Sequence, residues 1–168
     1  MNIDIRSLEP GDNQMSLPIP KEEIDASIAK LASDGNLELA IFHSDVESTV
    51  VADLTASVEL SCARCLCEFE MEITSQFTVA LRKGKPGTIS EDSDVPVIFY
   101  DAAEGLADIT AVVADEIGVN IPMQTVCDDD CKGLCVKCGA DLNEETCNCE
   151  KEAANPVWDK LKKLNKES

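Results

Sequence analysis

Residues 50–81 read VVADLTASVELSCARCLCEFEMEITSQFTVAL, two alternating runs joined by a short connection rich in cysteine. Apolar side chains alternate with mostly polar ones in residues 50–60 and again in 68–81, where three glutamates hold polar positions. Successive side chains of a β-strand point to opposite faces of its sheet, so this period of two predicts two strands, each with one buried and one wet face. The short connection predicts an antiparallel hairpin with the glutamates on its wet face.

One further apolar run extends this hairpin into an antiparallel meander, and another offers one more short strand. LELAIF at residues 37–42 precedes the hairpin and VIFY at 97–100 follows it, and both have the length and composition of strands. Residues 82–96 are polar and contain glycine and proline, which predicts a loop. We interpret the acidic run SEDSD in this loop as a solvated face, with a docking strip for a basic partner as the alternative.

Helical spacing of apolar residues occurs in three other places. Residues 24–31 have this spacing and are followed by a Gly-Asn stop. Residues 109–117 have it as well, with Asp108 placed to cap the first turn and Gly118 placed to end the last. A closing helix is expected in residues 155–168, where a tryptophan and two leucines share a face.

Together these elements predict an α+β fold. We expect a mostly antiparallel β-sheet or meander with a few short helices and a C-terminal four-cysteine zinc knuckle. Residues 1–126 should form the acidic α+β body with the sheet, and residues 127–168 the knuckle segment and the closing helix, packed on that body. A chain of 168 residues can bury a hydrophobic core without disulfides.

The nine cysteines are the strongest chemical signal, and six of them fall within residues 127–149. We find neither a secretory signal nor an apolar run that could span a membrane, so we expect a cytoplasmic protein with no membrane partner. Thiols stay reduced in the cytoplasm, where clustered cysteines are metal ligands or redox groups more often than disulfides. An odd number of cysteines also fits disulfides poorly.

Cys135 and Cys138 form a Cys-x2-Cys-Gly knuckle, in which two sulfurs meet one ion. Gly139 can adopt the left-handed conformation that turns backbone N–H groups toward thiolate. Cys147 and Cys149 supply a second pair after a short loop. Four thiolates make a closed tetrahedral Zn²⁺ site without an open position for a reacting water, so we expect structural zinc. An iron–sulfur cluster accepts the same ligands and is the alternative.

A second metal site is predicted from the connection of the hairpin. Cys62 and Cys65 lie near the hairpin tip, and two thiolates alone hold zinc poorly. Cys127 and Cys131 would complete the set and tie the hairpin to the C-terminal segment, with Cys67 as a competing ligand. The Cys-x2-Cys spacing also occurs in thiol–disulfide exchange, but that chemistry uses a thiolate at a helix N-terminus, and here a strand follows.

The net charge of -19 belongs to the body, because residues 1–131 hold 26 of the 33 acidic side chains but 7 of the 14 basic ones. Such a surface repels phosphate, so we expect no DNA partner, and a basic protein is easier to accommodate. Solubility alone would also explain the acidity. RNA would be approached through the neutral C-terminal part, where the lysines concentrate. The lysines expected to contact RNA or another partner are Lys132, Lys137, Lys160, Lys162 and Lys163, with Lys151 and Lys166 nearby.

Catalytic groups are scarce in this sequence. His43 is the only histidine, and at a predicted strand end we interpret it as a surface or capping residue. We can propose no serine–histidine–aspartate set, phosphate loop or calcium loop. The expected protein is therefore not an enzyme.

The order of these features resembles the YceD family of bacterial and plastid proteins, linked to accumulation of large-subunit ribosomal RNA. The resemblance covers roughly residues 50–165 and rests on a strand ending in CARCL, a helix closing in IGVNIPMQTVC, and then CKGLCVKCGADLN, CNC and NPVWDKLKKL. Val136 departs from the family, which usually has proline there. NPVW likewise replaces an Asp-Pro-Arg type of sequence.

The resemblance implies a non-enzymatic ribosome-biogenesis factor that supports accumulation of large-subunit (23S) ribosomal RNA. Its partner would be that RNA or a ribosomal protein, and zinc would be a scaffold, not the active agent. One alternative is an acidic binding module or holdase for a basic ribosomal protein. Another is a thiol redox or metal-handling protein, which requires an accessible thiol of low pKa.

Overall fold

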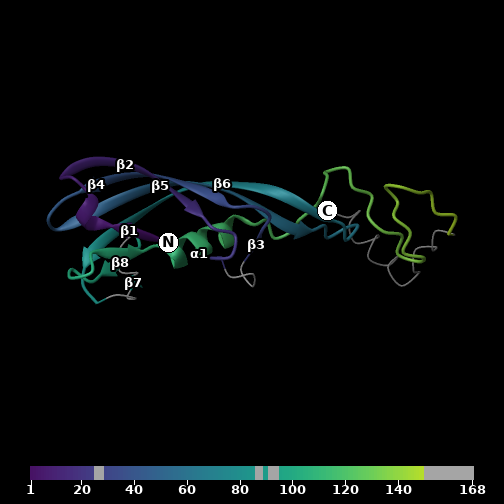
Figure 1. Ribbon diagram of the computed structural model, residues 1–168. Helices are drawn as coiled ribbons and strands as arrows, with labels where there is room; N and C mark the ends of the chain where they lie inside the picture. Colours follow the sequence, from purple (N-terminus) through teal and green to yellow (C-terminus); the bar gives the residue numbers. More distant parts are fainter. Residues whose placement is uncertain (25–28, 86–88, 91–94, 150–168) are drawn as a thin grey trace, which may run out of the picture.

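The computed structural model of the protein describes residues 1–24, 29–85, 89–90 and 95–149. These residues form a seven-stranded sheet, a two-stranded ribbon and one α-helix (Figure 1). The sheet contains β2 (Gly11–Ile19), β3 (Lys30–Leu31), β4 (Gly35–His43), β5 (Glu47–Ser61), β6 (Glu68–Lys83), β7 (Ile89–Ser90) and β8 (Val97–Tyr100). Its order is β2-β4-β5-β6-β8-β7, and β3 pairs β5 off this path. The remaining elements are β1 (Asn2–Asp4) paired with β9 (Leu106–Asp108), a 3₁₀ turn η1 (Ile5–Ser7), and α1 (Thr110–Asn120).

The β5–β6 hairpin is the centre of the sheet and confirms the strands predicted from residues 50–81. The two strands pair antiparallel along the whole of β5. Alternate side chains of β5 from Val50 to Val58 are at most 2% exposed, whereas Glu68, Glu70 and Glu72 of β6 are exposed. β4 joins β5 antiparallel, as LELAIF predicted, so the meander is confirmed as well.

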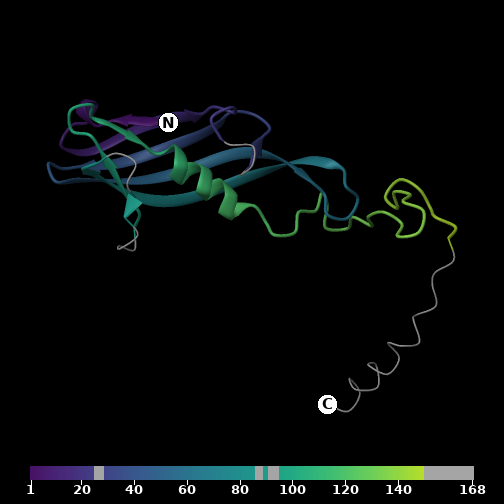
Figure 2. The same ribbon diagram turned by 90° about the horizontal axis from the view of Figure 1, so that it is seen from below.

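Within the described part of the chain, other elements cover one face of the sheet. Figure 1 shows β2, β4, β5 and β6 as an upper layer, with α1 and the β1–β9 ribbon beneath it. Seen from below in Figure 2, α1 crosses the underside of the sheet. Ile3, Ile109 and Ile117 of the lower layer share one core with the buried side chains of the sheet, and each is at most 1% exposed. Burying an isoleucine contributes about 1.5–3 kcal/mol, so this contact decides which face of the sheet is dry.

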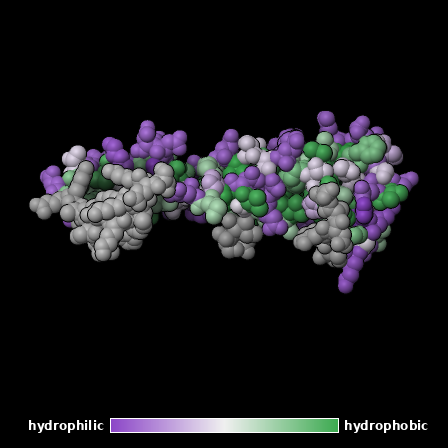
Figure 3. All heavy atoms as spheres, turned by 180° about the vertical axis from the view of Figure 1, so that it is seen from behind, coloured by the Kyte–Doolittle hydropathy of each residue, from purple (hydrophilic) through white to green (hydrophobic). Residues whose placement is uncertain are grey.

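The opposite face of the sheet is polar. In Figure 3 hydrophilic side chains line the upper surface of the molecule, and hydrophobic atoms gather lower, toward the core layer. The exposed face carries Glu38 opposite Asp53 and Glu59 opposite Glu70 on neighbouring strands. The acidity expected for the body therefore gathers in part on one open surface.

β2 was not predicted, although its residues show the alternation of a strand. Met15, Leu17 and Ile19 alternate with polar residues, and β2 pairs β4 antiparallel from Gly11 to Ile19. Pro18 lacks a backbone N–H, which is tolerated on an edge strand, and β2 lies at one edge of the sheet.

The helix predicted for residues 24–31 is wrong where the structure describes it. Residues 21–24 form a turn and bend, and Leu31 belongs to β3, where it lies opposite Val58 of β5. The Ala32 N–H donates to the Ser57 carbonyl at 2.8 Å. Pairing with β5 beyond the end of β4 outweighs local helical spacing here, since tertiary contacts override propensity. Residues 25–28 lie outside the described residues.

Two other expectations need correction in detail. VIFY forms the predicted strand, β8, but this strand pairs β6 parallel, unlike the other pairs of the mostly antiparallel sheet. α1 does not end at Gly118 but continues to Asn120. The N-cap is Ile109 and not the predicted Asp108, although the Thr110 N–H donates to the Asp108 carboxylate at 2.9 Å.

Candidate metal centres

Two groups of four cysteines come together beyond the turn from β5 to β6. The tip cluster consists of Cys62, Cys65, Cys127 and Cys131, and the knuckle cluster of Cys135, Cys138, Cys147 and Cys149. Within each cluster the four sulfur atoms lie within 4.8 Å of one another. The structure thus brings together the members of each predicted ligand set.

The first two cysteines of the tip cluster lie in a tight loop. The Cys62 N–H donates to the Cys67 carbonyl at 2.8 Å, and the Leu66 N–H donates to the Cys62 carbonyl at 2.9 Å. Leu66 has a φ of 62°, a left-handed conformation that is uncommon for a residue with a side chain. Cys62 and Cys65 are 0% and 7% exposed, so this constrained loop holds two buried thiols.

The other two cysteines follow α1 on a segment that is fastened to the hairpin. The Ala63 N–H donates to the Thr125 carbonyl at 2.8 Å, and the Thr125 hydroxyl donates to the Ser61 carbonyl at 2.8 Å. Cys127 follows Thr125 by two residues, so these bonds position it against the loop. Cys131 is 6% exposed.

The sulfur separations in the tip cluster fit one four-coordinate ion. Cys62 Sγ lies 3.8 Å from Cys131 Sγ, and Cys65 Sγ lies 3.6 Å from Cys127 Sγ. A tetrahedral Zn²⁺ with bonds of about 2.3 Å holds its sulfurs about 3.8 Å apart. In a cluster of several irons the thiolates are divided among different metal atoms, so the short separations favour a single ion.

A fifth thiol lies beside the tip cluster. Cys67 Sγ is 3.2 Å from Cys65 Sγ, and the Cys67 residue is exposed. Cys67 is not among the four sulfurs that are mutually within 4.8 Å. The geometry therefore favours Cys127 and Cys131 over the competing Cys67 as partners of the loop cysteines.

Arg64 joins the two halves of the tip cluster. Its Nη1 donates to the carbonyls of Asp129 at 2.9 Å and Cys131 at 3.0 Å, and its own carbonyl accepts from the Leu134 N–H at 3.0 Å. Gly133 has a φ of 72°, and a Cβ there would meet the Arg64 carbonyl oxygen at 2.8 Å. Arg64 was not predicted as a site residue, although its place between the predicted ligands in CARC could have indicated such a role.

The knuckle cluster is built on the turn predicted from Cys-x2-Cys-Gly. Gly139 has a φ of 74°, which confirms the left-handed glycine, and its N–H donates to the Cys135 carbonyl at 2.8 Å. The Cys135 N–H donates to the Ala140 carbonyl at 2.8 Å. Cys147 Sγ lies 3.3 Å from Cys135 Sγ and 3.5 Å from Cys138 Sγ, close to the spacing around one ion.

Asn143 connects the two clusters and was also missed. Its Nδ2 donates to Cys131 Sγ at 3.5 Å and to the Asp141 carboxylate at 2.7 Å. Its Oδ1 accepts from the Lys132 N–H at 2.8 Å. Groups that orient a ligand influence metal affinity strongly, so Asn143 is part of the candidate centre.

Backbone N–H groups favour thiolate at one cysteine in each cluster. The N–H of Cys65 lowers the pKa of Cys62 to about 6, and the N–H of Cys138 lowers the pKa of Cys135 to about 6. Burial and then the neighbouring thiols raise the pKa of Cys127. Four thiols this close cannot all ionise unless a cation offsets their charge, which is what a divalent metal ion does.

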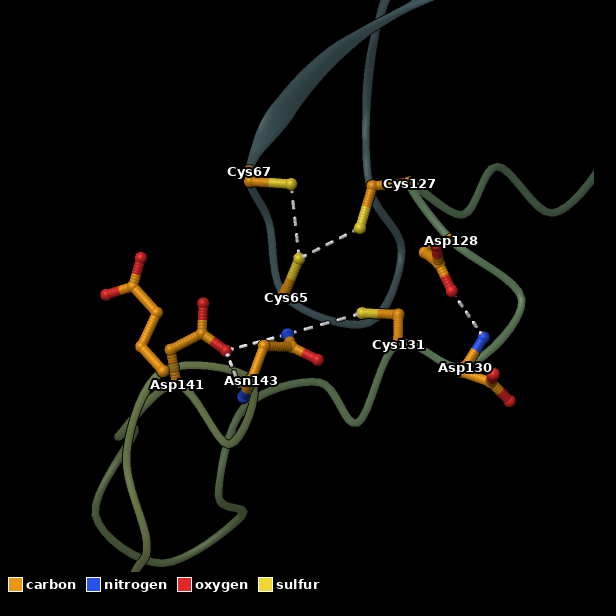
Figure 4. Close-up of a pocket in the computed structure, with 9 residues that line it drawn as sticks. Cys65, Cys67, Cys127, Asp128, Asp130, Cys131, Asp141 and Asn143 are labelled. Carbon is orange, nitrogen blue, oxygen red and sulfur yellow. Dashed lines mark hydrogen bonds between the residues drawn. The ribbon is translucent and has the colours of Figure 1, made fainter.

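An acidic hollow of about 390 Å³ opens beside the tip cluster (Figure 4). Carboxylates of Asp128, Asp130, Asp141 and Glu144 line it together with the cysteines. Carboxylates attract cations and repel phosphate. The hollow therefore suits the approach of a metal ion and does not suit contact with an RNA backbone.

The lysines predicted to contact a partner are only partly placed. Lys132 and Lys137 are exposed on the cysteine segment, and the Lys132 N–H is the group bonded to Asn143. The other predicted contacts and the expected closing helix lie outside the described residues, namely Lys160, Lys162 and Lys163, together with Lys151 and Lys166.

The alternative chemistries find little support in this geometry. His43 ends β4, and its Nδ1 lies 2.7 Å from the hydroxyl of Ser48 on β5, a cross-strand contact of a structural kind. Cys62 has the low pKa that thiol exchange needs but no exposed surface, whereas Cys135 has the same low pKa and is partly exposed, so the knuckle cluster keeps the thiol redox alternative open. Among the described residues no helix is long and apolar enough to cross a membrane.

Comparison with known proteins assigns the family. A family model described as large ribosomal RNA subunit accumulation protein YceD matches residues 50–165, which include most of β5, all of β6 and α1, and both cysteine clusters. The chain belongs to the YceD family. Membership confirms the resemblance seen in the sequence, and the YceD description concerns accumulation of large-subunit ribosomal RNA.

Individual relatives resemble this YceD chain over limited lengths. A chloroplastic large ribosomal RNA subunit accumulation protein YCED homolog 1 from Arabidopsis thaliana is 35% identical over 60 residues, 36% of this chain and 19% of the plant protein. Its namesake from Zea mays is 39% identical over 54 residues, 32% of this chain and 18% of that protein. An uncharacterized protein of Mycobacterium leprae is 26% identical over 126 residues, 75% of this chain and 57% of that protein. The chain thus spans less than two thirds of these relatives, and no solved structure is significantly similar to it.

Proposed function

We propose that this protein is a non-catalytic assembly factor that supports accumulation of large-subunit (23S) ribosomal RNA, with one structural Zn²⁺ in each cysteine cluster. The observation that carries the proposal is the family match, which spans the hairpin and both clusters. Two closed four-thiolate sites leave no position for a reacting water, which supports a structural role for the metal. Partner contacts are then made by the protein surface.

The scaffold role of zinc follows from how little apolar surface the cysteine segment buries. Besides its own cysteines, the described apolar neighbours of the tip cluster are the partly buried Phe69, Val126 and Leu134. A structural zinc ion contributes about 10–16 kcal/mol to the folding of small finger peptides. An ion in the tip cluster would therefore replace the missing core and hold residues 127–134 against the hairpin.

The function is tested in cells that lack the protein. We expect the ratio of large-subunit to small-subunit ribosomal RNA to fall, and the wild-type gene to restore it. Cys62→Ser and Cys138→Ser should restore the ratio incompletely, and metal analysis of the purified wild type should find two zinc ions per chain. An unchanged ratio in the deletion strain would contradict the assigned process, and iron in place of zinc would contradict the metal.

A second candidate route to the same outcome is binding of a basic ribosomal protein. The observation that favours it is the open acidic face, where Glu59 lies opposite Glu70 and Glu38 opposite Asp53. Lys30 already forms an ion pair with Glu59, whereas Glu38 and Asp53 are like charges directly opposite each other, a repulsion that a basic partner would relieve. Ultraviolet cross-linking in cells separates the routes: large-subunit RNA enriched above an acidic control protein indicates direct RNA contact. Co-purifying basic proteins without RNA indicate the second route.

A further inference from the structure

Most of β6 has an unpaired edge. β5 pairs with β6 along its whole length, whereas β8 pairs with it only from Ala80 to Lys83. Across the described parts of the chain, no backbone hydrogen bond joins residues 68–79 to anything but β5. This stretch therefore offers free backbone donors and acceptors of the kind that accept an added strand.

The direction of these groups follows from the bonds at the far end of the strand. The Ala80 N–H donates to the Pro96 carbonyl at 3.0 Å, and the Gly84 N–H donates to the Tyr100 carbonyl at 3.0 Å, both away from β5. Backbone groups alternate in direction along an antiparallel strand, so the even-numbered residues of β6 point outward. Those on the unpaired edge are Glu68, Glu70, Glu72, Thr74, Gln76 and Thr78.

The same residues carry their side chains on the wet face. Glu68, Glu70 and Glu72 are exposed, and Glu59 of β5 lies opposite Glu70. A strand added at this edge would place every second side chain beside these carboxylates. Lysine or arginine at those positions makes favourable cross-strand pairs, while acidic residues or phosphates are repelled.

We propose that an extended, lysine- or arginine-rich segment of a partner protein adds as a strand to the free edge of β6. This rests on the second route of the proposed function, in which the partner is a basic ribosomal protein. Charge decides the occupant: a second copy of β6 would bring no cation to Glu68, Glu70 and Glu72, and an RNA backbone would meet these three carboxylates. Main-chain bonds supply the docking, and the carboxylates select the basic partner.

The first test uses a fluorescein-labelled peptide of four Lys-Thr repeats, measured by anisotropy with the metal-loaded full chain. Two matched peptides of equal charge are N-methylated, one at every lysine and one at every threonine. In an antiparallel addition the lysine N–H groups face β6, so methylation at lysine should weaken binding at least tenfold and methylation at threonine should not. A parallel addition would reverse the two. Equal affinity of the two methylated peptides would overturn the proposal. So would a Glu-Thr repeat peptide that binds as tightly as the Lys-Thr peptide, or a Lys-Thr peptide that does not bind.

Variants locate the binding edge. Thr74→Pro removes an outward N–H without removing a bond to β5 and should weaken binding at least tenfold. Gln14→Pro is the control on β2, at the opposite edge of the sheet. The backbone of Gln14 points the same way as that of Pro18, a position of this strand where proline already occurs. A triple variant, Glu68→Gln with Glu70→Gln and Glu72→Gln, should also weaken binding. It keeps the edge testable if the proline variant does not fold. Asp12→Asn with Glu104→Gln and Asp115→Asn removes as much charge at exposed positions away from β6 and should leave binding within about threefold.

Amide exchange and a cell assay complete the test. Bound peptide should slow exchange of the even-numbered amides in residues 70–78, and unchanged exchange there would overturn strand addition. Failure of the edge variants to restore ribosomal RNA in deletion cells supports the edge as the working contact. Full restoration of ribosomal RNA by the edge variants would overturn the edge of β6 as the contact and leave the proposed function intact. A deletion strain with normal ribosomal RNA would instead sink the proposed function, while the peptide experiment would still decide the edge.

Discussion

The side-chain amide of Asn143 lies 3.5 Å from the sulfur of Cys131, so the loop of the knuckle cluster contacts a ligand of the tip cluster. The same side chain accepts the Lys132 N–H at 2.8 Å, which fixes the backbone between the clusters. Amide donors to a thiolate stabilise its negative charge. The two clusters are therefore expected to act as one unit, with metal binding in one sensitive to order in the other.

Removal of the Asn143 contact should weaken metal binding at the tip cluster. Asn143→Ala deletes the donor to Cys131 and the acceptor for Lys132, and losses of this kind typically lower metal affinity by about 10- to 100-fold. Competition with a chromophoric zinc chelator measures the change. Asn120→Ala is the matched control, because that amide bonds Glu116 on α1. Wild-type affinity in Asn143→Ala would refute the coupling.

Loss of one knuckle ligand should disorder the knuckle and spare the sheet. Cys138→Ser is expected to reduce zinc from two ions to one per chain and to abolish amide-exchange protection in residues 135–149. Cys62→Ser should do the same for residues 127–134. Cys67→Ser is the control and should keep both ions, because Cys67 is outside the four mutually close sulfurs. Zinc loss with protection unchanged would show that the ion is not a scaffold.

Two left-handed glycines allow a matched test of the Arg64 contact. Gly133 and Gly139 have φ values of 72° and 74°, so alanine costs each about 1–2 kcal/mol of backbone strain. A Cβ at Gly133 also meets the Arg64 carbonyl at 2.8 Å, while nothing lies within 4 Å of one at Gly139. Gly133→Ala should therefore release residues 127–134 from the hairpin and speed zinc loss to EDTA well beyond Gly139→Ala. Equal rates of zinc loss for the two variants would show that the Arg64 contact does not hold residues 127–134 in place.

The contribution of Asp108 to stability should depend on pH. Partial burial raises its pKa, but hydrogen bonds from the Thr110 hydroxyl and N–H, with the N-terminal ammonium, lower it further than burial raises it. The folded pKa is therefore below the ordinary 3.8, so the carboxylate stabilises the fold above that pH and loses this effect as pH falls through the folded pKa. Asp108→Ala should cost about 1 kcal/mol at neutral pH and progressively less in acid.

Urea unfolding in the presence of EDTA, at neutral and strongly acidic pH, measures this difference without interference from zinc release. Asp115→Ala changes an exposed carboxylate on the same helix and serves as the control. Its replacement controls for the loss of one carboxylate from the helix. A constant cost for Asp108→Ala across the range would show that the helix start does not depend on the carboxylate charge.

Sequence patterns predicted those parts of the sheet and of the ligand sets that depend on residues near one another along the chain. Period-two alternation predicted β4, β5 and β6, because it reflects which face of a strand is dry. It was also present in β2, where we overlooked it. Helical spacing gave a wrong prediction at Leu31, because this residue pairs with Val58, a partner distant in sequence. Arg64 and Asn143 escaped notice because their roles depend on carbonyls and a sulfur brought close only by folding.

By itself the sequence determined the alternating strands, the left-handed Gly139, the cysteine spacings and the family, since each is written in residues near one another along the chain. Only the tertiary structure decided that Cys62 and Cys65 meet Cys127 and Cys131, that β8 runs parallel to β6, and that no other described strand pairs with residues 68–79 of β6 besides β5. Strand neighbours and metal ligands are chosen by packing between distant segments. A one-dimensional pattern constrains that packing but does not contain it.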